Sequence, residues 1–143
     1  MKEKNFPFQY PRSNEFFYVG PTPSKPGQVF GSGGPTTSGR MDAYSPRLIK
    51  LGLHAMIGKG YRSDAVKKAI VDYHGVYFGA IGGAGAMMSS CIEECEVIAF
   101  DDLGPEAIRK LKVKNMPLVV VIDHLGNDLY EIGRKNYLKK DCK

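Results

Sequence analysis

Apolar runs of strand length that alternate with helical patterns are the feature that most restricts the fold of this sequence. Strands are predicted at residues 15–19, 53–57, 76–81, 97–100 and 118–122, followed by a short strand near Leu129. Helices are predicted from a Ser45 cap, with Pro46 in the first turn, to a stop at Gly52, and from a Ser63 cap to a stop at Gly75. Two more are predicted from Gly85 through Glu94 and from Pro105 to Leu111. This alternation predicts an α/β layered domain whose sheet is at least partly parallel. A turn after residue 122 would close a hairpin, so we expect the sheet to be mixed.

The length of 143 residues corresponds to one domain. We therefore expect residues 1–143 to form a single domain with polar arms at 1–15 and 134–143.

The net charge is +5, but the basic residues form no stripe with interleaved aromatics, and no nucleic-acid motif is present. The longest apolar stretch, residues 118–122, is too short to span a bilayer. We expect no nucleic-acid partner and no membrane partner.

The cysteines predict neither a disulfide framework nor a metal site. Their number is odd, three, and no apolar run follows the first residues, so a reducing, cytoplasmic location is expected. Cys91 and Cys95 are four residues apart on a predicted helix, and Cys142 lies in the charged tail. Without a third or fourth ligand nearby, a metal site is not predicted.

A loop rich in glycine, proline and hydroxyl residues is the strongest candidate for a binding site. Its glycines, Gly34 among them, let backbone N–H groups approach a ligand closely. Three consecutive side chains add hydroxyl groups: Thr36, Thr37 and Ser38. Arg40 follows them, and its planar guanidinium suits a carboxylate held by two parallel hydrogen bonds. The pattern indicates an anion site, although an ordinary flexible loop remains the alternative.

Two further glycine-rich turns follow predicted strands. Lys59 lies between Gly58 and Gly60 at a strand end, where α/β sheets place ligands, although a solvated lysine is the simpler alternative. The run from Gly82 to Gly85 resembles a dinucleotide-binding turn only superficially, because Met88 occupies the position of the third glycine. Close backbone packing, or a third wall of the same pocket, is favoured there.

Several segments, in unbroken order over about residues 16–130, together resemble one family. They are Gly20-Pro21-Thr22-Pro23, the run Gly34-Pro35-Thr36-Thr37-Ser38-Gly39-Arg40-Met41-Asp42, Gly58-Lys59-Gly60, Ala80-Ile81-Gly82-Gly83-Ala84, Gly104-Pro105-Glu106-Ala107-Ile108, and Val121-Ile122-Asp123 with Gly126-Asn127. This set resembles the β subunit, or C-terminal domain, of class I iron–sulfur hydro-lyases. These are the fumarate hydratases and L-tartrate dehydratases.

The resemblance implies a swivelling β/β/α domain that faces a larger α subunit. The α subunit would carry a [4Fe–4S] cluster through three cysteines, and this chain would bind none. The resemblance also implies that Thr36 is catalytic, near the carbon that exchanges a proton, and that Arg40 and Lys59 bind substrate carboxylates. We expect further substrate-binding groups from the same loop: Thr37, Ser38 and Gly34. The expected function is the substrate-binding half of a hydro-lyase acting on malate and fumarate, or on tartrate and oxaloacetate, active only with its α partner.

The chain departs from the family pattern at its start. Family β subunits carry an earlier Arg-Asp-x-x-His segment whose arginine also binds substrate, and this chain begins after that point. A fragment, a truncated paralogue and a separately encoded N-terminal piece all remain open. A non-catalytic carboxylate-binding or assembly module is therefore the alternative function. The choice of substrate, the oligomeric state and self-association of the isolated chain also remain open.

Overall fold

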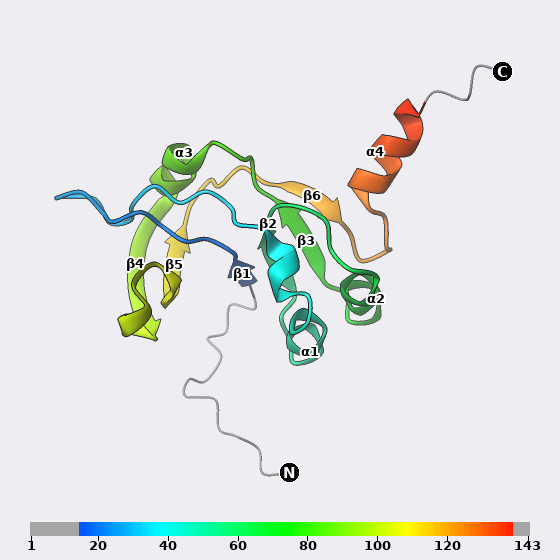
Figure 1. Ribbon diagram of the computed structural model, residues 1–143, viewed down its shortest axis with the longest axis horizontal. Coiled ribbons are helices and arrows are strands. Elements are labelled where there is room, and N and C mark those ends of the chain that lie inside the picture. The colour runs from blue at the N-terminus through cyan, green and yellow to red at the C-terminus, as the bar shows by residue number, and fades with distance from the viewer. Residues whose placement is uncertain (1–14, 139–143) are drawn as a thin grey trace, which may run out of the picture.

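A four-stranded mixed sheet organises the chain in the computed structural model, which describes residues 15–138 (Figure 1). Its strand order is β1-β2-β3-β6. The strands are β1 (Glu15–Phe17), β2 (Ala55–Gly58), β3 (Val76–Gly79) and β6 (Val119–Ile122). The first three are parallel, and β6 runs antiparallel to β3. The predicted α/β class with a mixed, partly parallel sheet is confirmed.

The helices α1 (Ser45–Lys50) and α2 (Asp64–Asp72) pack against each other and against the main core. The predicted cap of α2 is confirmed, because Ser63 Oγ accepts a hydrogen bond from the Val66 N–H at 3.4 Å. Apolar residues recur along α2 at helical spacing, which gives the helix one buried face. The buried residues of this core come from α1, β2, α2, β3, β6 and the loop before β2: Ile49, Leu53, Met56, Val66, Ala69, Ile70, Tyr77, Val121 and Ile122.

A two-stranded antiparallel sheet, β4 (Ile92–Ala99) with β5 (Ile108–Val113), stands beside the first sheet (Figure 1). Here one predicted helix is present but shorter than expected, and the other is wrong. The helix α3 (Gly85–Ser90) stops before Glu94, and the segment expected to be helical after Pro105 is strand β5. The short 3-10 helix η2 (Asp101–Glu106) connects the two strands.

Cross-strand charge pairing accounts for the strands that replace the predicted helices. Lys110 and Lys112 of β5 lie opposite Glu96 and Glu94 of β4. The Lys112 Nζ–Glu94 Oε1 distance is 2.7 Å. Opposite charges that face each other across two strands stabilise the pairing. Lysine and glutamate favour helices in isolation, but these long-range contacts outweigh that local preference.

The C-terminal part is also helical rather than extended. The strand predicted near Leu129 is wrong, because α4 covers Leu129–Tyr137. Asp128 caps this helix, since its Oδ1 accepts a hydrogen bond from the Tyr130 N–H at 3.0 Å. The predicted arms lie partly outside the described residues, at 1–14 and 139–143. Between residues 15 and 138 no helix is long and apolar enough to cross a membrane, and the longest, α2 and α4, have nine residues each.

Candidate functional site

The hydroxyl-rich loop lies across the carboxyl ends of β1 and β2. The Thr36 N–H donates to the Tyr18 carbonyl at 2.8 Å. The Lys59 N–H donates to the Thr36 carbonyl at 3.3 Å, and the Ser38 N–H donates to the Lys59 carbonyl at 3.1 Å. Thr37 thereby forms an isolated parallel bridge with Lys59. Two segments that the sequence analysis selected separately therefore meet at the edge of the sheet where α/β proteins bind ligands.

The cationic side chains of this edge are exposed. Arg40 lies in η1 (Ser38–Met41), a short 3-10 turn that follows Thr37 directly. Both Arg40 and Lys59 are exposed, as is Thr37, whereas Thr36 is partly buried. The structure shows no hydrogen bond or ion pair of the Arg40 or Lys59 side chain with any other residue in the range 15–138. Two positive charges from separate segments are thus available to an anion at one edge of the sheet.

Ser38 differs from its neighbours because its side chain points into the protein. It is 0% exposed, and its Oγ lies 3.0 Å from the Tyr77 hydroxyl, with which it forms a hydrogen bond. The loop passes very close to β2 at this point, since a Cβ placed on Gly58 would lie 1.8 Å from Ser38 Oγ. Only glycine fits position 58 with Ser38 where it is.

The glycine-rich turn before α3 packs against the start of the same loop. The Gly33 N–H donates to the Gly85 carbonyl at 3.2 Å. A Cβ on Gly85 would lie 3.1 Å from the Gly34 nitrogen and 2.8 Å from Ser32 Oγ. The close backbone packing favoured for this turn is confirmed at Gly85.

A buried arginine, Arg62, lies beneath the exposed edge, and the sequence analysis missed it. Its side chain is 0% exposed, and its Nε lies 2.7 Å from Asp42 Oδ1. Its Nη2 donates to Ser45 Oγ at 2.8 Å, and its Nη1 lies 3.4 Å from Met56 Sδ. The other carboxylate oxygen of Asp42 accepts a hydrogen bond from the Ser63 N–H at 2.5 Å. A buried charge of this kind requires such a complete set of partners.

Two aromatic rings enclose the same guanidinium. Its central carbon lies 5.5 Å from the centroid of the Tyr18 ring and 5.0 Å from that of Tyr77. Both distances fall within the range of cation–π attraction. Burial raises the pKa of the Tyr77 hydroxyl, so the hydroxyl keeps its proton well into the alkaline range. In the sequence, Asp42 follows Arg40 by two residues and Arg62 follows Lys59 by three, but these spacings do not indicate that Asp42 and Arg62 pair.

The prediction that Ser45 caps α1 is wrong. The residue before the first turn of α1 is Tyr44, and the helix has no side-chain cap there, although Pro46 stands in the first turn as expected. The Ser45 hydroxyl instead donates to the Met41 carbonyl at 2.8 Å and accepts from Arg62. The Ser45 hydroxyl, which was predicted to cap α1, therefore serves as a hydrogen-bond partner of the buried Arg62.

Comparison with known proteins adds a second line of evidence. A family model described as the fumarase C-terminus matches residues 1–133. The chain belongs to the fumarase C-terminus family.

The relatives of this chain are named as two kinds of enzyme, fumarate hydratase and L(+)-tartrate dehydratase. Fumarate hydratase 1, mitochondrial, from Leishmania major is 39% identical over 125 residues, which is 86% of this chain and 23% of that protein. The aerobic class I fumarate hydratase of Escherichia coli K12 is 38% identical, with the same coverage of 86% and 23%. The putative L(+)-tartrate dehydratase subunit beta of Methanocaldococcus jannaschii is 40% identical over 74% of this chain and 57% of that subunit. The chain thus spans about a quarter of the length of the fumarate hydratases it matches.

The two cysteines that the structure describes belong to other elements than the candidate site. Cys91 follows the last turn of α3, and Cys95 lies on β4 opposite Leu111. The helix that was predicted to carry both is therefore absent, and so is their common helical face. Across residues 15–138, no three side chains of histidine, cysteine, aspartate or glutamate are grouped to hold a metal ion. The residues described do not fit an iron–sulfur cluster, which requires thiolate ligands.

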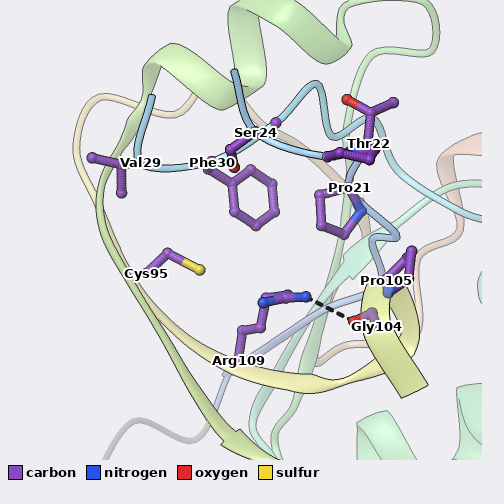
Figure 2. Close-up of a pocket in the computed structure, with 11 residues that line it drawn as sticks. Pro21, Thr22, Ser24, Val29, Phe30, Cys95, Gly104, Pro105 and Arg109 are labelled. Carbon is purple, nitrogen blue, oxygen red and sulfur yellow. Dashed lines mark hydrogen bonds between the residues drawn. The ribbon is translucent and has the colours of Figure 1, made fainter. Parts of the chain in front are cut away.

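A separate cavity of about 250 Å³ lies between the segment 21–31 and the β4–β5 sheet (Figure 2). Phe30, Cys95 and Arg109 line it, and the Arg109 Nη2 donates to the Gly104 carbonyl at 2.7 Å. None of the predicted site residues lines this cavity. The candidate site of this chain is therefore the sheet edge that carries Arg40 and Lys59, and not this cavity.

Proposed function

We propose that this chain is the substrate-binding half of a hydro-lyase that interconverts a hydroxy-dicarboxylate and its dehydrated product. The substrate pair would be malate and fumarate, or tartrate and oxaloacetate. One observation carries the proposal: the Thr36–Lys59–Ser38 backbone bridge brings the hydroxyl loop, with Arg40 at its end, to the segment that carries Lys59. Membership of the fumarase C-terminus family supports it.

The charges at this edge match a substrate with two carboxylates. Arg40 would hold one carboxylate through two parallel hydrogen bonds, and Lys59 would neutralise the other as a point charge. Because these side chains come from different segments, each can contact a different end of the substrate. Gly34 and Thr37 would add backbone and hydroxyl donors at the same edge. Ser38 would contribute through its backbone position, since its hydroxyl contacts Tyr77.

Thr36 is the proposed group nearest the proton transfer. Removal of water requires that a proton leave the carbon next to a carboxylate. A threonine hydroxyl is a poor base alone, so it would pass or position the proton in concert with an ionised group of a partner. The partial burial of Thr36 and the hydrogen bond from its N–H to Tyr18 fix the backbone from which this hydroxyl extends.

The chemistry at the hydroxyl-bearing carbon would belong to a partner. We propose an α subunit that carries a [4Fe–4S] cluster as a Lewis acid, and we assign no step to the cysteines of this chain. The name of the M. jannaschii relative, subunit beta, supports a separate partner subunit. The chain alone would then bind dicarboxylate but show no dehydratase activity.

Calorimetric titration of the chain with malate, fumarate and both tartrate enantiomers tests the binding half of the proposal. We expect weak binding that falls as salt rises, because exposed charges are screened over about 8 Å at physiological ionic strength. Recovery of a partner on the tagged chain, followed by assay of the complex with the same substrates, tests the catalytic half. Binding without any activity in the recovered complex would favour a non-catalytic carboxylate-binding or assembly module. Activity of the chain alone would contradict the subunit assignment.

A further inference from the structure

The segments that carry Arg40 and Lys59 are joined below the surface at two places. Asp42, two residues after Arg40, pairs with Arg62, three residues after Lys59, at 2.7 Å. Ser38, two residues before Arg40, hydrogen-bonds the Tyr77 hydroxyl at 3.0 Å. That hydroxyl also hydrogen-bonds the carbonyl of Gly60, the residue after Lys59, at 3.2 Å.

These contacts lie on both sides of Arg40 and directly after Lys59. Arg40 lies between Ser38 and Asp42, and the segment of Lys59 is held at Gly60 and Arg62. The exposed arginine and lysine are therefore attached to one buried assembly. A shift of either segment alone would break a buried hydrogen bond or separate a buried ion pair, and both are costly.

Burial makes this assembly rigid. Arg62 is held by Asp42 and Ser45 and lies beside the rings of Tyr18 and Tyr77, so no part of its side chain is exposed. A buried ion pair seldom stabilises a fold more than well-packed apolar residues of the same volume would. Such a pair can instead fix one geometry among several.

We propose that Tyr77 and Arg62 are positioning residues that hold Arg40 and Lys59 at the separation needed to bind both carboxylates of one substrate. The inference rests on the proposed function and adds to it a determinant of substrate size. Neither residue touches the substrate; each acts through the segment that it holds. Removal of either contact would let the two cations move independently, and the affinity for a dicarboxylate would fall.

The test uses Tyr77→Phe in the full chain, because this change deletes one hydroxyl and keeps the ring beside Arg62. Tyr73→Phe is the matched control, since Tyr73 follows α2 and is 37% exposed. Titration calorimetry with malate measures affinity, and NMR hydrogen exchange follows the Ser38 and Lys59 amides. The Val76 amide, which donates to the His54 carbonyl at the far end of β3, serves as internal reference.

We expect Tyr77→Phe to weaken malate binding by at least about two- to tenfold, because that factor corresponds to one buried neutral hydrogen bond and the change removes both contacts of the hydroxyl, with Ser38 and with Gly60. The Ser38 and Lys59 amides should exchange faster by a similar factor, while Val76 and the Tyr73→Phe variant stay unchanged. A residue that only stabilised the fold would lower the melting temperature and leave the malate affinity of the folded protein intact. Arg62→Lys, which keeps the charge but loses the planar guanidinium, should weaken binding further if it folds.

The outcomes separate this inference from the proposed function. Unchanged malate affinity with unchanged exchange in Tyr77→Phe would overturn the inference and leave the carboxylate site standing. If the wild-type chain binds no dicarboxylate, the proposed function fails. In that case the exchange rates of Tyr77→Phe still test whether Tyr77 holds the two segments together. Faster exchange at the Ser38 and Lys59 amides supports that role, and unchanged exchange refutes it.

Discussion

Replacement of Arg40 by lysine tests the proposed carboxylate contact with little disturbance of the fold. Arg40 is exposed, and its side chain makes no hydrogen bond or ion pair within residues 15–138. A surface substitution of this kind changes the free energy of unfolding by no more than about 0.5 kcal/mol. For a domain of this size that corresponds to about 1–2 °C in melting temperature. The folded protein should therefore survive the change intact.

The binding consequence should be much larger. Lysine keeps the positive charge but loses the planar guanidinium that makes two parallel hydrogen bonds to a carboxylate. One lost charge-assisted hydrogen bond costs about 1.5–3 kcal/mol, which is roughly ten- to a hundred-fold in affinity or in kcat/KM. The assays are calorimetry with malate for the chain and steady-state kinetics for its complex. Both are run beside a thermal melt.

Arg47→Lys is the matched control, because Arg47 is an exposed arginine on α1. It should change neither melting temperature nor affinity. If the hydroxyl loop served only for packing, Arg40→Lys would lose stability and activity together. Wild-type affinity and kinetics in a stable Arg40→Lys variant would refute the assignment of this loop as the substrate clamp.

Three further results are expected. Thr36→Ala in the assembled complex should lower kcat with little change in KM, because its proposed role is in proton transfer rather than binding; a raised KM with normal kcat would contradict that role. Asp42→Ala leaves the buried Arg62 without its counter-ion and should cost about 3–5 kcal/mol in the free energy of unfolding, measured by urea denaturation; a loss below 1 kcal/mol would contradict the burial described. Denaturation across alkaline pH should show stability falling above about pH 10, the ordinary pKa of tyrosine. Burial raises the pKa of Tyr77, and the Asp128 and Glu131 carboxylates raise that of Lys67. Because each group binds its proton more tightly in the folded protein, its contribution to the free energy of unfolding is complete below the unfolded pKa and is lost as pH rises through the folded pKa. In Tyr77→Phe, stability should therefore fall less steeply with rising pH.

The sequence predicted the main sheet and its helices because their signals are local. The strands β2, β3 and β6 are short apolar runs, and α1 ends at the predicted Gly52, whereas the left-handed residue after α2 is His74 rather than Gly75. The strand predicted at 97–100 lies largely within β4, but the first half of β4 and all of β5 were missed because their pairing is non-local: Glu94 and Lys112 are 18 residues apart and meet only in the folded protein. The helix α4 was missed because the segment near Leu129 was interpreted as a short strand, whereas the Asp128 carboxylate caps a helix there and pairs with Lys67 at 2.8 Å.

The candidate site likewise contains residues that local signals predict and residues that only non-local contacts place. Its exposed members, such as Arg40 and Lys59, could be found from residue type and motif, because surface chemistry depends on the side chain itself. The buried support could not, because nothing local distinguishes the buried Arg62 from an exposed arginine such as Arg47. Asp42 is 20 residues from Arg62 in the chain, and their pairing is decided by how the loop and α1 pack together.

In the motif Gly58-Lys59-Gly60, the two glycines satisfy constraints of packing and backbone conformation, and the lysine between them carries an exposed charge. Gly58 is restricted by packing, since a Cβ there would lie 1.8 Å from Ser38 Oγ and 3.2 Å from Ser38 Cβ. Gly60 has φ +87°, a conformation that favours glycine, and its carbonyl accepts a hydrogen bond from the Tyr77 hydroxyl. Lys59 between them donates and accepts the backbone hydrogen bonds that bind the loop, which leaves its side chain free at the surface. The two glycines thus place the loop and its arginine against the strand end, and the lysine supplies the second charge from the same position.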